Sequence, residues 1–195
     1  MYENIKSRKE LKRQEYNLIR YSNSSLTHEK IKSAVKSAMK ILLTKYHKKG
    51  KYIGIYWPLK GEVDIRFIKK NIKQKVALPS SSKIEGLSYH HWSNSELELD
   101  SNKILSPMGE DPIKADDISL LLVPAIAVDQ EGYRLGYGGG YFDRLRQKDI
   151  WISIPSFVII SDNCISKEPL PRDTWDLPFS GWISENGLHQ IQSTK

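Results

Sequence analysis

An apolar run at residues 118–123, followed by a glycine-rich loop, constrains the fold of this chain more than any other feature. A strand with one face in water alternates apolar and polar residues, whereas this run predicts a central parallel strand covered on both faces. The loop at residues 134–146 reads RLGYGGGYFDRLR and has four glycines within five residues. One or two glycines are enough for a tight turn. The excess indicates a backbone that must come close to another group.

A strand, a helix and a second strand are predicted ahead of the central strand. Residues 51–57 are rich in β-branched and aromatic side chains, as is typical of a strand, and residues 75–79 form a second short apolar segment. Between them, Asp64 is placed to cap a helix over residues 65–73. Such a unit has a right-handed connection. Residues 156–160 supply another buried strand.

The first 51 residues are strongly basic, with 14 of the 30 Lys and Arg against 4 of the 23 Asp and Glu. One helix is predicted over residues 6–20. A second helix is predicted with Thr27 as its N-cap and with an apolar face made of Ile31, Val35, Ala38, Leu42 and Tyr46. These basic helices could attract nucleic acid, an anionic lipid surface or a polyanionic small molecule, or could present a solvated face.

Residues 80–117 show less regularity, with a strand predicted near residues 86–92 and a long loop near residues 106–117. His90 and His91 are neighbours, so on a strand they point to opposite faces and cannot easily share a metal ion. Cys164 is the only cysteine, which excludes an internal disulfide and fits a buried small side chain in a reducing compartment.

The pattern of segments predicts an α/β fold. We expect one three-layer, Rossmann-like domain over residues 1–195, with a mainly parallel sheet and N-terminal basic helices. The hydrophobic content of 39% and charged content of 27% are typical of a globular protein. The sequence lacks a signal-peptide pattern and an apolar run long enough for a bilayer, so we expect a cytoplasmic protein without a membrane partner. We also expect a monomer. Ligands of such sheets bind beyond the carboxyl ends of the strands.

The glycine loop matches neither common phosphate motif. A Walker A loop would end in Gly-Lys-Ser/Thr, and a dinucleotide fingerprint would have glycine at Tyr141. What remains is an anion site of backbone N–H groups at the start of a helix, supported by Arg134 and Arg144 on either side.

Asp143 is an unexpected residue beside an anion site, because a carboxylate repels phosphate. A divalent cation between the two removes the repulsion, so Asp143 predicts Mg²⁺. The alternative is a structural turn in which Asp143 pairs with Arg146.

Several segments resemble the 5-formyltetrahydrofolate cyclo-ligase family, also called 5,10-methenyltetrahydrofolate synthetases. The resemblance is carried by VPAIAVDQEGYRLGYGGGYFDRL, with YWPLKGEVDIRFI, VALP and LPRDTWDLPFSGWISENG in the same order. It covers most of the chain from about residue 52 onward. It implies ATP-dependent closure of 5-formyltetrahydrofolate to 5,10-methenyltetrahydrofolate, with ADP and phosphate released, Mg²⁺ as cofactor, and ATP and the folate as the small-molecule partners.

The resemblance also implies roles for individual residues. Glu62, Arg134 and Tyr141 would be catalytic, and Asp143 and Asp176 would hold the metal ion. Trp57 and Glu62 would contact the folate together with Gly138, Gly139, Gly140 and Tyr141. The ATP phosphates would be bound by Arg134, Leu135, Gly136, Tyr137, Gly138, Gly139, Gly140, Tyr141 and Phe142. As alternatives, Glu62 could be a solvated residue at a helix start, and Trp57 could be ordinary core.

Two departures from the family pattern concern the cationic residues. The family has K..LR near its N-terminus, where this chain has RKELK, which places Arg8 and Lys12 on the ATP phosphates. Some members carry a lysine or arginine inside the glycine loop, where this chain has Tyr137 and Gly139. The basic N-terminal helix could supply the missing charge, and it would also suit the anionic tail of folate.

Two other functions remain open from the residues alone. One is a nucleic-acid-binding protein that uses the basic helices. The chain shows no RRM, KH or zinc-finger pattern, so we expect no nucleic-acid partner. The other is a different enzyme with a phosphate-containing ligand on the same fold, because fold alone does not determine chemistry.

Overall fold

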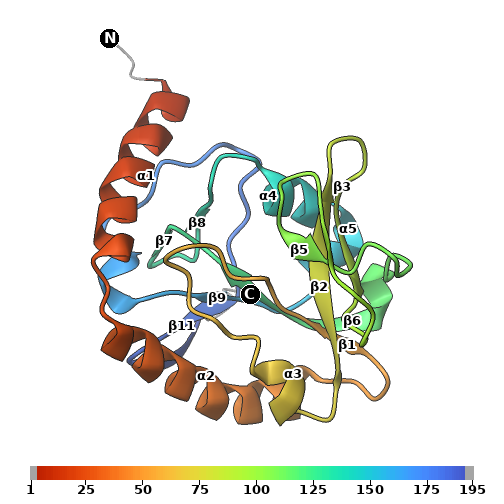
Figure 1. Ribbon diagram of the computed structural model, residues 1–195. Coiled ribbons are helices and arrows are strands. Elements are labelled where there is room, and N and C mark those ends of the chain that lie inside the picture. Colours follow the sequence, from red (N-terminus) through yellow and green to blue (C-terminus); the bar gives the residue numbers. More distant parts are fainter. Residues whose placement is uncertain (1–3, 192–195) are drawn as a thin grey trace.

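The computed structural model describes residues 4–191, and its centre is a seven-stranded sheet with the order β12-β11-β9-β6-β1-β2-β3 (Figure 1). The five inner strands run parallel, while β12 and β3 pair antiparallel at the two edges. The strands of this sheet are β1 (Tyr52–Gly54), β2 (Lys75–Ser82), β3 (Gly86–His91), β6 (Ile118–Pro124), β9 (Ser156–Ile159), β11 (Gly181–Ser184) and β12 (Gly187–Gln190). The predicted α/β fold with a mainly parallel sheet is confirmed.

Helices and a small sheet cover the two faces of the large sheet. The helices are α1 (Ile5–Tyr21), α2 (Ser25–Tyr46), α3 (Ile68–Asn71), α4 (Tyr141–Arg146) and α5 (Asp149–Ile152), with 3₁₀ turns at Ala115–Asp117 and Asp162–Cys164. The small sheet has the order β10-β7-β8, made of β7 (Ala127–Asp129), β8 (Arg134–Leu135) and β10 (Ile165–Ser166). In Figure 1, α2 and α3 lie on one side of the sheet, and α4 and α5 lie on the other.

Strand β6 is covered on both faces, which explains why residues 120–123 are all apolar. Leu120 and Leu122 pack into the core under α2, while Leu121 and Val123 pack into the core on the opposite face. All seven residues of β6 are buried. The prediction of a central strand covered on both faces is therefore confirmed.

Helix α2 buries the apolar face that its periodicity predicts, but it begins earlier than expected. Ile31, Val35 and Leu42 are all buried against the sheet. The N-cap is Ser24, whose hydroxyl accepts a hydrogen bond from the Thr27 backbone N–H at 3.1 Å. The prediction of Thr27 as N-cap is therefore wrong, because the helix already begins at Ser25 and Thr27 lies in its first turn, where its own N–H donates to Ser24.

The connection between β1 and β2 is less helical than the sequence indicates. Asp64 accepts hydrogen bonds from the backbone N–H and guanidinium of Arg66, at 3.0 and 2.8 Å, and so closes a turn instead of capping a long helix. Helix α3 starts only at Ile68. The apolar spacing was real, since Ile65 and Ile68 are buried, but turns place these side chains in the core as well as a helix would.

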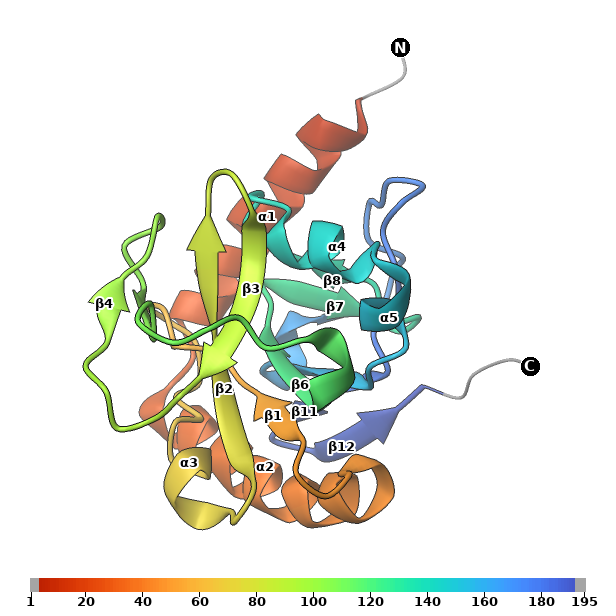
Figure 2. The ribbon, with the colours of Figure 1, turned by 90° about the vertical axis from the view of Figure 1, so that its right-hand side faces the viewer.

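Residues 80–117 form an excursion along one edge of the sheet. Strands β2 and β3 make a hairpin, and β4 (Glu98–Leu99) pairs with β5 (Leu105–Ser106) beyond it (Figure 2). The buried Asp100 side chain ties the excursion to β2. It accepts from the Ser81 backbone N–H at 2.8 Å, from the Ser81 hydroxyl at 2.6 Å, and from the backbone N–H groups of Asn102 and Ile104 at 2.9 and 3.0 Å.

Across residues 4–191, no helix combines the length and the apolar character that crossing a membrane requires.

Candidate active site

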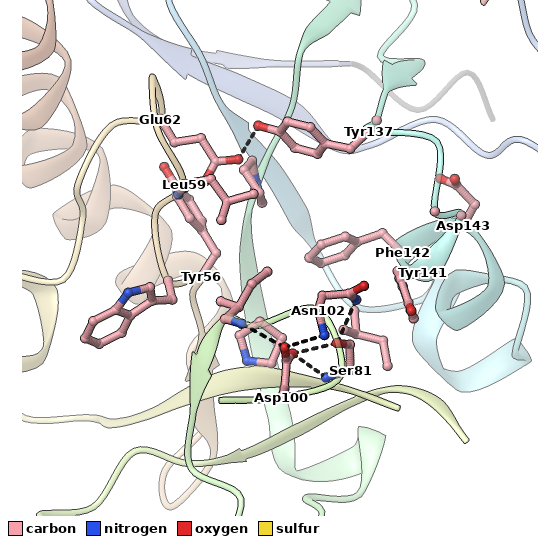
Figure 3. A pocket seen from close by; sticks show the side chains of 18 of the residues that line it. Tyr56, Leu59, Glu62, Ser81, Asp100, Asn102, Tyr137, Tyr141, Phe142 and Asp143 are labelled. Atoms are coloured by element: carbon pink, nitrogen blue, oxygen red, sulfur yellow. Dashed lines mark hydrogen bonds between the residues drawn. The ribbon is translucent and has the colours of Figure 1, made fainter. Parts of the chain in front are cut away.

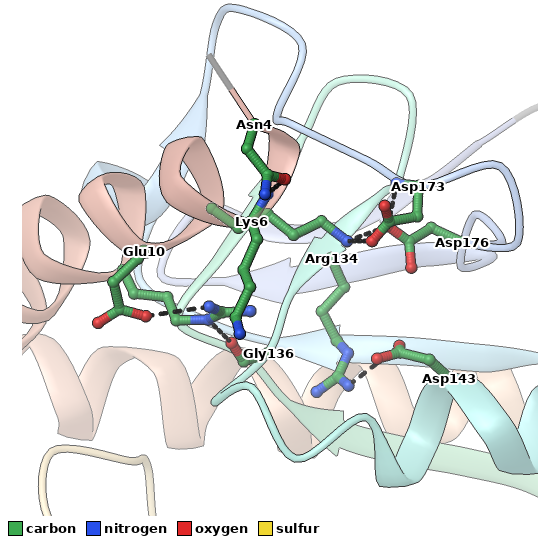
Figure 4. A network of polar contacts seen from close by, with 10 residues as sticks. Asn4, Lys6, Glu10, Arg134, Gly136, Asp143, Asp173 and Asp176 are labelled. Atoms are coloured by element: carbon green, nitrogen blue, oxygen red, sulfur yellow. Dashed lines mark hydrogen bonds and ion pairs between the residues drawn. The ribbon is translucent and has the colours of Figure 1, made fainter.

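Two cavities meet at the carboxyl edge of the parallel strands, on either side of the glycine loop. The apolar cavity has a volume of about 370 Å³, and Pro124, the last residue of β6, lines it. Its aromatic and aliphatic walls include Tyr56, Trp57, Leu87, Ile104, Tyr141 and Phe142 (Figure 3). The polar cavity has a volume of about 410 Å³ and charged walls that include Lys6, Lys9, Arg13, Arg144, Asp173 and Asp176 (Figure 4).

The glycine loop forms the wall between the two cavities. Arg134, Gly136, Gly140 and Asp143 line both. Gly138 and Gly140 have φ angles of 97° and 63°, which side-chain-bearing residues rarely adopt, so these positions favour glycine. Helix α4 is six residues long, so the charge around the loop comes mainly from side chains and only weakly from a helix dipole.

Arg134 is a cation of the loop whose side chain is only 4% exposed. Its Nη1 atom donates to the Pro124 carbonyl at 2.9 Å, and its Nη2 atom lies 3.5 Å from Asp143 Oδ1. Its guanidinium also lies over the Phe142 ring, 4.9 Å from the ring centroid. These contacts hold one positive charge at the boundary of the two cavities.

Asp143 pairs with Arg134, which excludes the alternative of an Asp143–Arg146 pair. Arg146 instead donates to the carbonyls of Leu177 and Pro178, at 3.1 and 2.9 Å. Burial and the nearby positive charge of Arg134 together lower the pKa of Arg146 to about 10, against the opposing effect of the Asp143 carboxylate. The carboxylate of Asp143 is 32% exposed and faces both cavities, so it remains accessible to a cation.

Asp176 lies in the polar cavity but is already neutralised. Lys9 Nζ lies 2.5 Å from Asp176 Oδ2 and 2.8 Å from Asp173 Oδ2. Burial alone would lower the pKa of Lys9, but the hydrogen bonds and charges of the two aspartates raise it instead. In residues 4–191, no three His, Cys, Asp or Glu side chains form a ready metal site. Asp143 could hold Mg²⁺ only together with oxygen atoms of a ligand, which is the usual mode beside phosphates.

The expected N-terminal cations are displaced by one residue. Arg8 is exposed and Lys12 pairs with Glu15 at 2.8 Å, and neither lines the two cavities. Lys9 and Arg13 line the polar cavity in their place, and Arg13 Nε donates to the Gly136 carbonyl at 2.8 Å. Adjacent residues on a helix differ in direction by about 100°, so a shift of one residue changes the face entirely. The apolar contact of Tyr16 on the same face is the signal that could have set the register.

Glu62 lies at the rim of the apolar cavity and accepts two hydrogen bonds. The Leu59 backbone N–H donates to Oε2 at 2.7 Å, and the Tyr137 hydroxyl donates to Oε1 (Figure 3). Burial raises the pKa of Glu62, while these hydrogen bonds and the charges of Arg20 and Arg134 oppose that rise. Because α3 begins only at Ile68, Glu62 is not the solvated helix-start residue that the alternative described.

The loop residues expected near phosphate divide between the cavities. Gly138 and Leu135 line the polar cavity, although the Leu135 side chain is itself buried. Tyr137, Tyr141 and Phe142 line the apolar cavity, as does Gly139. The three aromatic residues thus line the apolar cavity, whereas Arg144 lines the polar cavity and Arg134 lines both.

Trp57 lines the apolar cavity and also packs within the protein. Its ring contacts the edge of Trp92 at a centroid distance of 6.0 Å, and the Arg66 guanidinium lies over it at 4.3 Å. Sequence reasoning missed the opposite wall, made by Ser81, Asp100, Asn102 and Ile104, because nothing in residues 80–117 shows that they fold back over the sheet.

The model of the 5-formyltetrahydrofolate cyclo-ligase family matches residues 4–182. The 5-formyltetrahydrofolate cyclo-ligase of Escherichia coli K12 is 28% identical over 143 residues, which are 68% of this chain and 76% of that protein. The Haemophilus influenzae protein of the same name is 36% identical over 66 residues, which are 33% of this chain and 34% of that protein.

Two solved structures share the fold. The NMR structure of Aquifex aeolicus 5,10-methenyltetrahydrofolate synthetase has a TM-score of 0.78 and 28% identity, covering 96% of this chain and 94% of that one. The Mycoplasma pneumoniae 5,10-methenyltetrahydrofolate synthetase has a TM-score of 0.70 at 18% identity, covering 91% and 98%, which is a likeness of fold. With the family model spanning most of the sequence, this chain belongs to the 5-formyltetrahydrofolate cyclo-ligase family of enzymes.

Proposed function

We propose that this enzyme closes 5-formyltetrahydrofolate to 5,10-methenyltetrahydrofolate at the expense of ATP, with release of ADP and phosphate. Family membership supports the folate reaction. The observation that carries the proposal is the glycine loop as a shared wall between an apolar and a cationic cavity. A planar folate on one side and a triphosphate on the other would meet at this wall.

The chemistry explains why two adjacent sites are needed. A formamide oxygen is a poor leaving group, so the formyl oxygen first attacks the γ-phosphorus and ADP departs. The N10 amine then attacks the activated formyl carbon, N10 loses its proton, and phosphate leaves with the former formyl oxygen. Phosphoryl transfer depends mainly on alignment and charge neutralisation, which the two cavities would provide.

On the phosphate side, Arg134 would stabilise the negative charge that develops at the wall. Lys9 and Arg13 would bind the remaining phosphates, taking the roles expected of Arg8 and Lys12. Asp143 would hold Mg²⁺, whose charge would neutralise phosphate oxygens. Asp176 would serve the metal ion only if Lys9 turned from it toward phosphate, which makes Asp143 the principal ligand.

On the folate side, Glu62 would accept hydrogen bonds from the pterin N–H groups, because a carboxylate has acceptor capacity beyond the two bonds it already makes. Trp57, Tyr141 and Phe142 would provide apolar walls for the ring system. Tyr141 also lies next to Gly140 at the shared wall, close to where the formyl group would react.

The direct test is to incubate the purified protein with Mg-ATP and 5-formyltetrahydrofolate and to follow the absorbance of the methenyl product. We expect an absorbance rise that requires ATP and is accompanied by stoichiometric phosphate release. The control omits ATP and includes a cyclo-ligase of known activity. A folded protein that gives no product while the control enzyme does would refute the proposal.

A further inference from the structure

Arg20, at the carboxyl-terminal end of α1, is a buried cation that the proposed reaction leaves unexplained. It is 6% exposed. Its Nη1 atom donates a hydrogen bond to the Tyr137 hydroxyl, and its guanidinium lies 5.1 Å from the centroid of the Tyr137 ring. Its Nε atom is buried without a hydrogen-bond partner among the described residues. A cation in such a place needs a negative charge nearby.

Glu62 supplies that charge through Tyr137. The Tyr137 hydroxyl accepts from Arg20 and donates to Glu62 Oε1, so the three side chains form one chain of hydrogen bonds. They come from three separate segments of the sequence, namely α1, the glycine loop and the connection after β1. Figure 3 shows the Tyr137 hydroxyl directed at the Glu62 carboxylate.

The directions of these hydrogen bonds select one state of Glu62. Arginine has only donors, so the single Tyr137 proton must point toward Glu62. The Leu59 backbone N–H also donates, to the other oxygen at 2.7 Å. Both carboxyl oxygens therefore face donors, an arrangement that a carboxylate satisfies and that a protonated carboxyl group satisfies poorly.

Helix α1 links the hydrogen bonds of Arg20, Tyr137 and Glu62 to the polar cavity. Lys9, Arg13 and Arg20 are separated by four and seven residues, so they lie on one face of the helix. Lys9 and Arg13 line the polar cavity, and Arg20 reaches the rim of the apolar cavity through Tyr137. One helical face thus contacts both sides of the glycine loop.

We propose that Arg20 and Tyr137 are positioning residues that hold Glu62 as a carboxylate aimed at the folate, an inference that rests on the proposed function. Pterin N–H groups are donors, so the carboxylate is the state that binds them. Tyr137 therefore acts on the folate side of the loop, through Glu62, rather than on the ATP phosphates. The groups that face Glu62 are Arg20 from α1, Tyr137 and Arg134 from the loop region, and the buried Tyr56 after β1.

The decisive measurement is a pH titration of Glu62 in Tyr137→Phe. It is monitored by carbon-13 NMR of the labelled carboxyl group in the unliganded protein. Burial raises the Glu62 pKa and the Tyr137 hydrogen bond lowers it. Removing the hydroxyl should therefore move the midpoint to higher pH, by about one unit. Arg20→Met should move the Glu62 midpoint in the same direction. Arg20→Lys keeps the charge, so its midpoint should lie closer to that of the wild-type protein.

The affinity for 5-formyltetrahydrofolate, measured without ATP, should fall at low pH as Glu62 becomes protonated. In Tyr137→Phe the midpoint of this fall should move to higher pH by the same amount as the Glu62 midpoint. The affinity should recover at high pH, where Glu62 is ionised again. Tyr46→Phe is the matched control, because the Tyr46 hydroxyl contacts Gln190 at 3.4 Å, and Tyr46 lines neither cavity. It should leave both curves unchanged. If Arg20→Met does not fold, Tyr137→Phe and Arg20→Lys still decide the matter.

An unchanged Glu62 midpoint in folded Tyr137→Phe would overturn the positioning role. This outcome is separate from failure of the proposed function, which would appear as a wild-type protein that makes no methenyl product. The NMR titration needs neither substrate, so it tests the hydrogen bonds of Arg20, Tyr137 and Glu62 whether or not the wild-type protein makes methenyl product.

Discussion

The apolar and polar cavities share the glycine loop as a wall, but different forces shape their outer walls. The apolar cavity is enclosed by side chains that continue into the core, and by an excursion that the buried Asp100 holds in place. The polar cavity is enclosed by charged groups that neutralise one another, such as Lys9 with Asp173 and Asp176. Packing preorganises the first cavity, whereas the second depends on charges that a phosphate ligand would rearrange.

This difference predicts that substitutions in the shared wall affect both substrates, while substitutions in an outer wall affect one. The expected effects below run from the largest to the smallest.

Arg134→Met should produce the largest loss because Arg134 lines both cavities. We expect kcat to fall by about 10²–10³-fold, the usual effect of removing a donor that stabilises developing charge. Arg134→Lys should recover little, since lysine cannot both donate to the Pro124 carbonyl and face Asp143 as the planar guanidinium does. Steady-state kinetics with each substrate varied tests this. A loss confined to the KM of one substrate would show that the wall is not shared.

Asp143→Asn should reduce kcat by about 10²-fold and raise the Mg²⁺ concentration needed for half-maximal rate, because a carboxylate ligand is lost. Folate binding without ATP should change little. Asp176→Asn is the comparison, and we expect a smaller effect because Lys9 already neutralises Asp176. Equal effects of the two substitutions on the Mg²⁺ dependence would contradict Asp143 as the principal ligand. Unchanged turnover in Asp143→Asn would show that Asp143 has only a structural role.

Arg13→Met should raise the KM for ATP by about tenfold, the cost of one charge-assisted contact of roughly 1.4 kcal/mol. Arg8→Met and Lys12→Met should change it by less than twofold, because Arg8 is exposed and Lys12 pairs with Glu15. Initial rates at saturating folate measure all three variants. An ATP effect in Arg8→Met larger than in Arg13→Met would restore the register expected from the sequence.

Asp100→Asn should affect the apolar cavity alone. An asparagine side chain can replace only part of the acceptor set that binds Ser81, Asn102 and Ile104, so we expect a loss of about 1–3 kcal/mol in the free energy of unfolding. The KM for folate should rise severalfold and the KM for ATP should not change. Denaturant unfolding and kinetics together check this, and an ATP effect as large as the folate effect would refute the separation of the two walls.

Local sequence patterns were sufficient for the elements that frame the site. The apolar run of β6 indicated a strand with two covered faces, and Leu120 and Leu121 indeed pack on opposite sides of it. The periodicity of α2 located its buried face. The glycines indicated an unusual backbone, and Gly138 and Gly140 have positive φ angles. Each of these features depends on neighbours within a few residues.

The features that local patterns did not place depend on contacts between distant segments. Whether Arg8 or Lys9 faces the cavity is set by how α1 docks, and the Arg13–Gly136 hydrogen bond that reports this docking joins residues 123 apart in the sequence. Asp64 closes a turn because Ile65 and Ile68 reach the core without a full helix. Asp100 gave no signal, because an aspartate in a loop is ordinary until its partners are known.

The sequence by itself determined a mainly parallel α/β sheet, a basic N-terminal helix pair and a glycine loop beyond a buried strand, because periodicity and glycine content act locally. Only the tertiary structure decided that the loop separates two cavities, that Tyr137, Tyr141 and Phe142 face the apolar one while Arg134 faces both, and that Arg20, Tyr137 and Glu62 meet. Those relations arise from how packed elements orient against one another, and a pattern along the chain carries no record of that orientation.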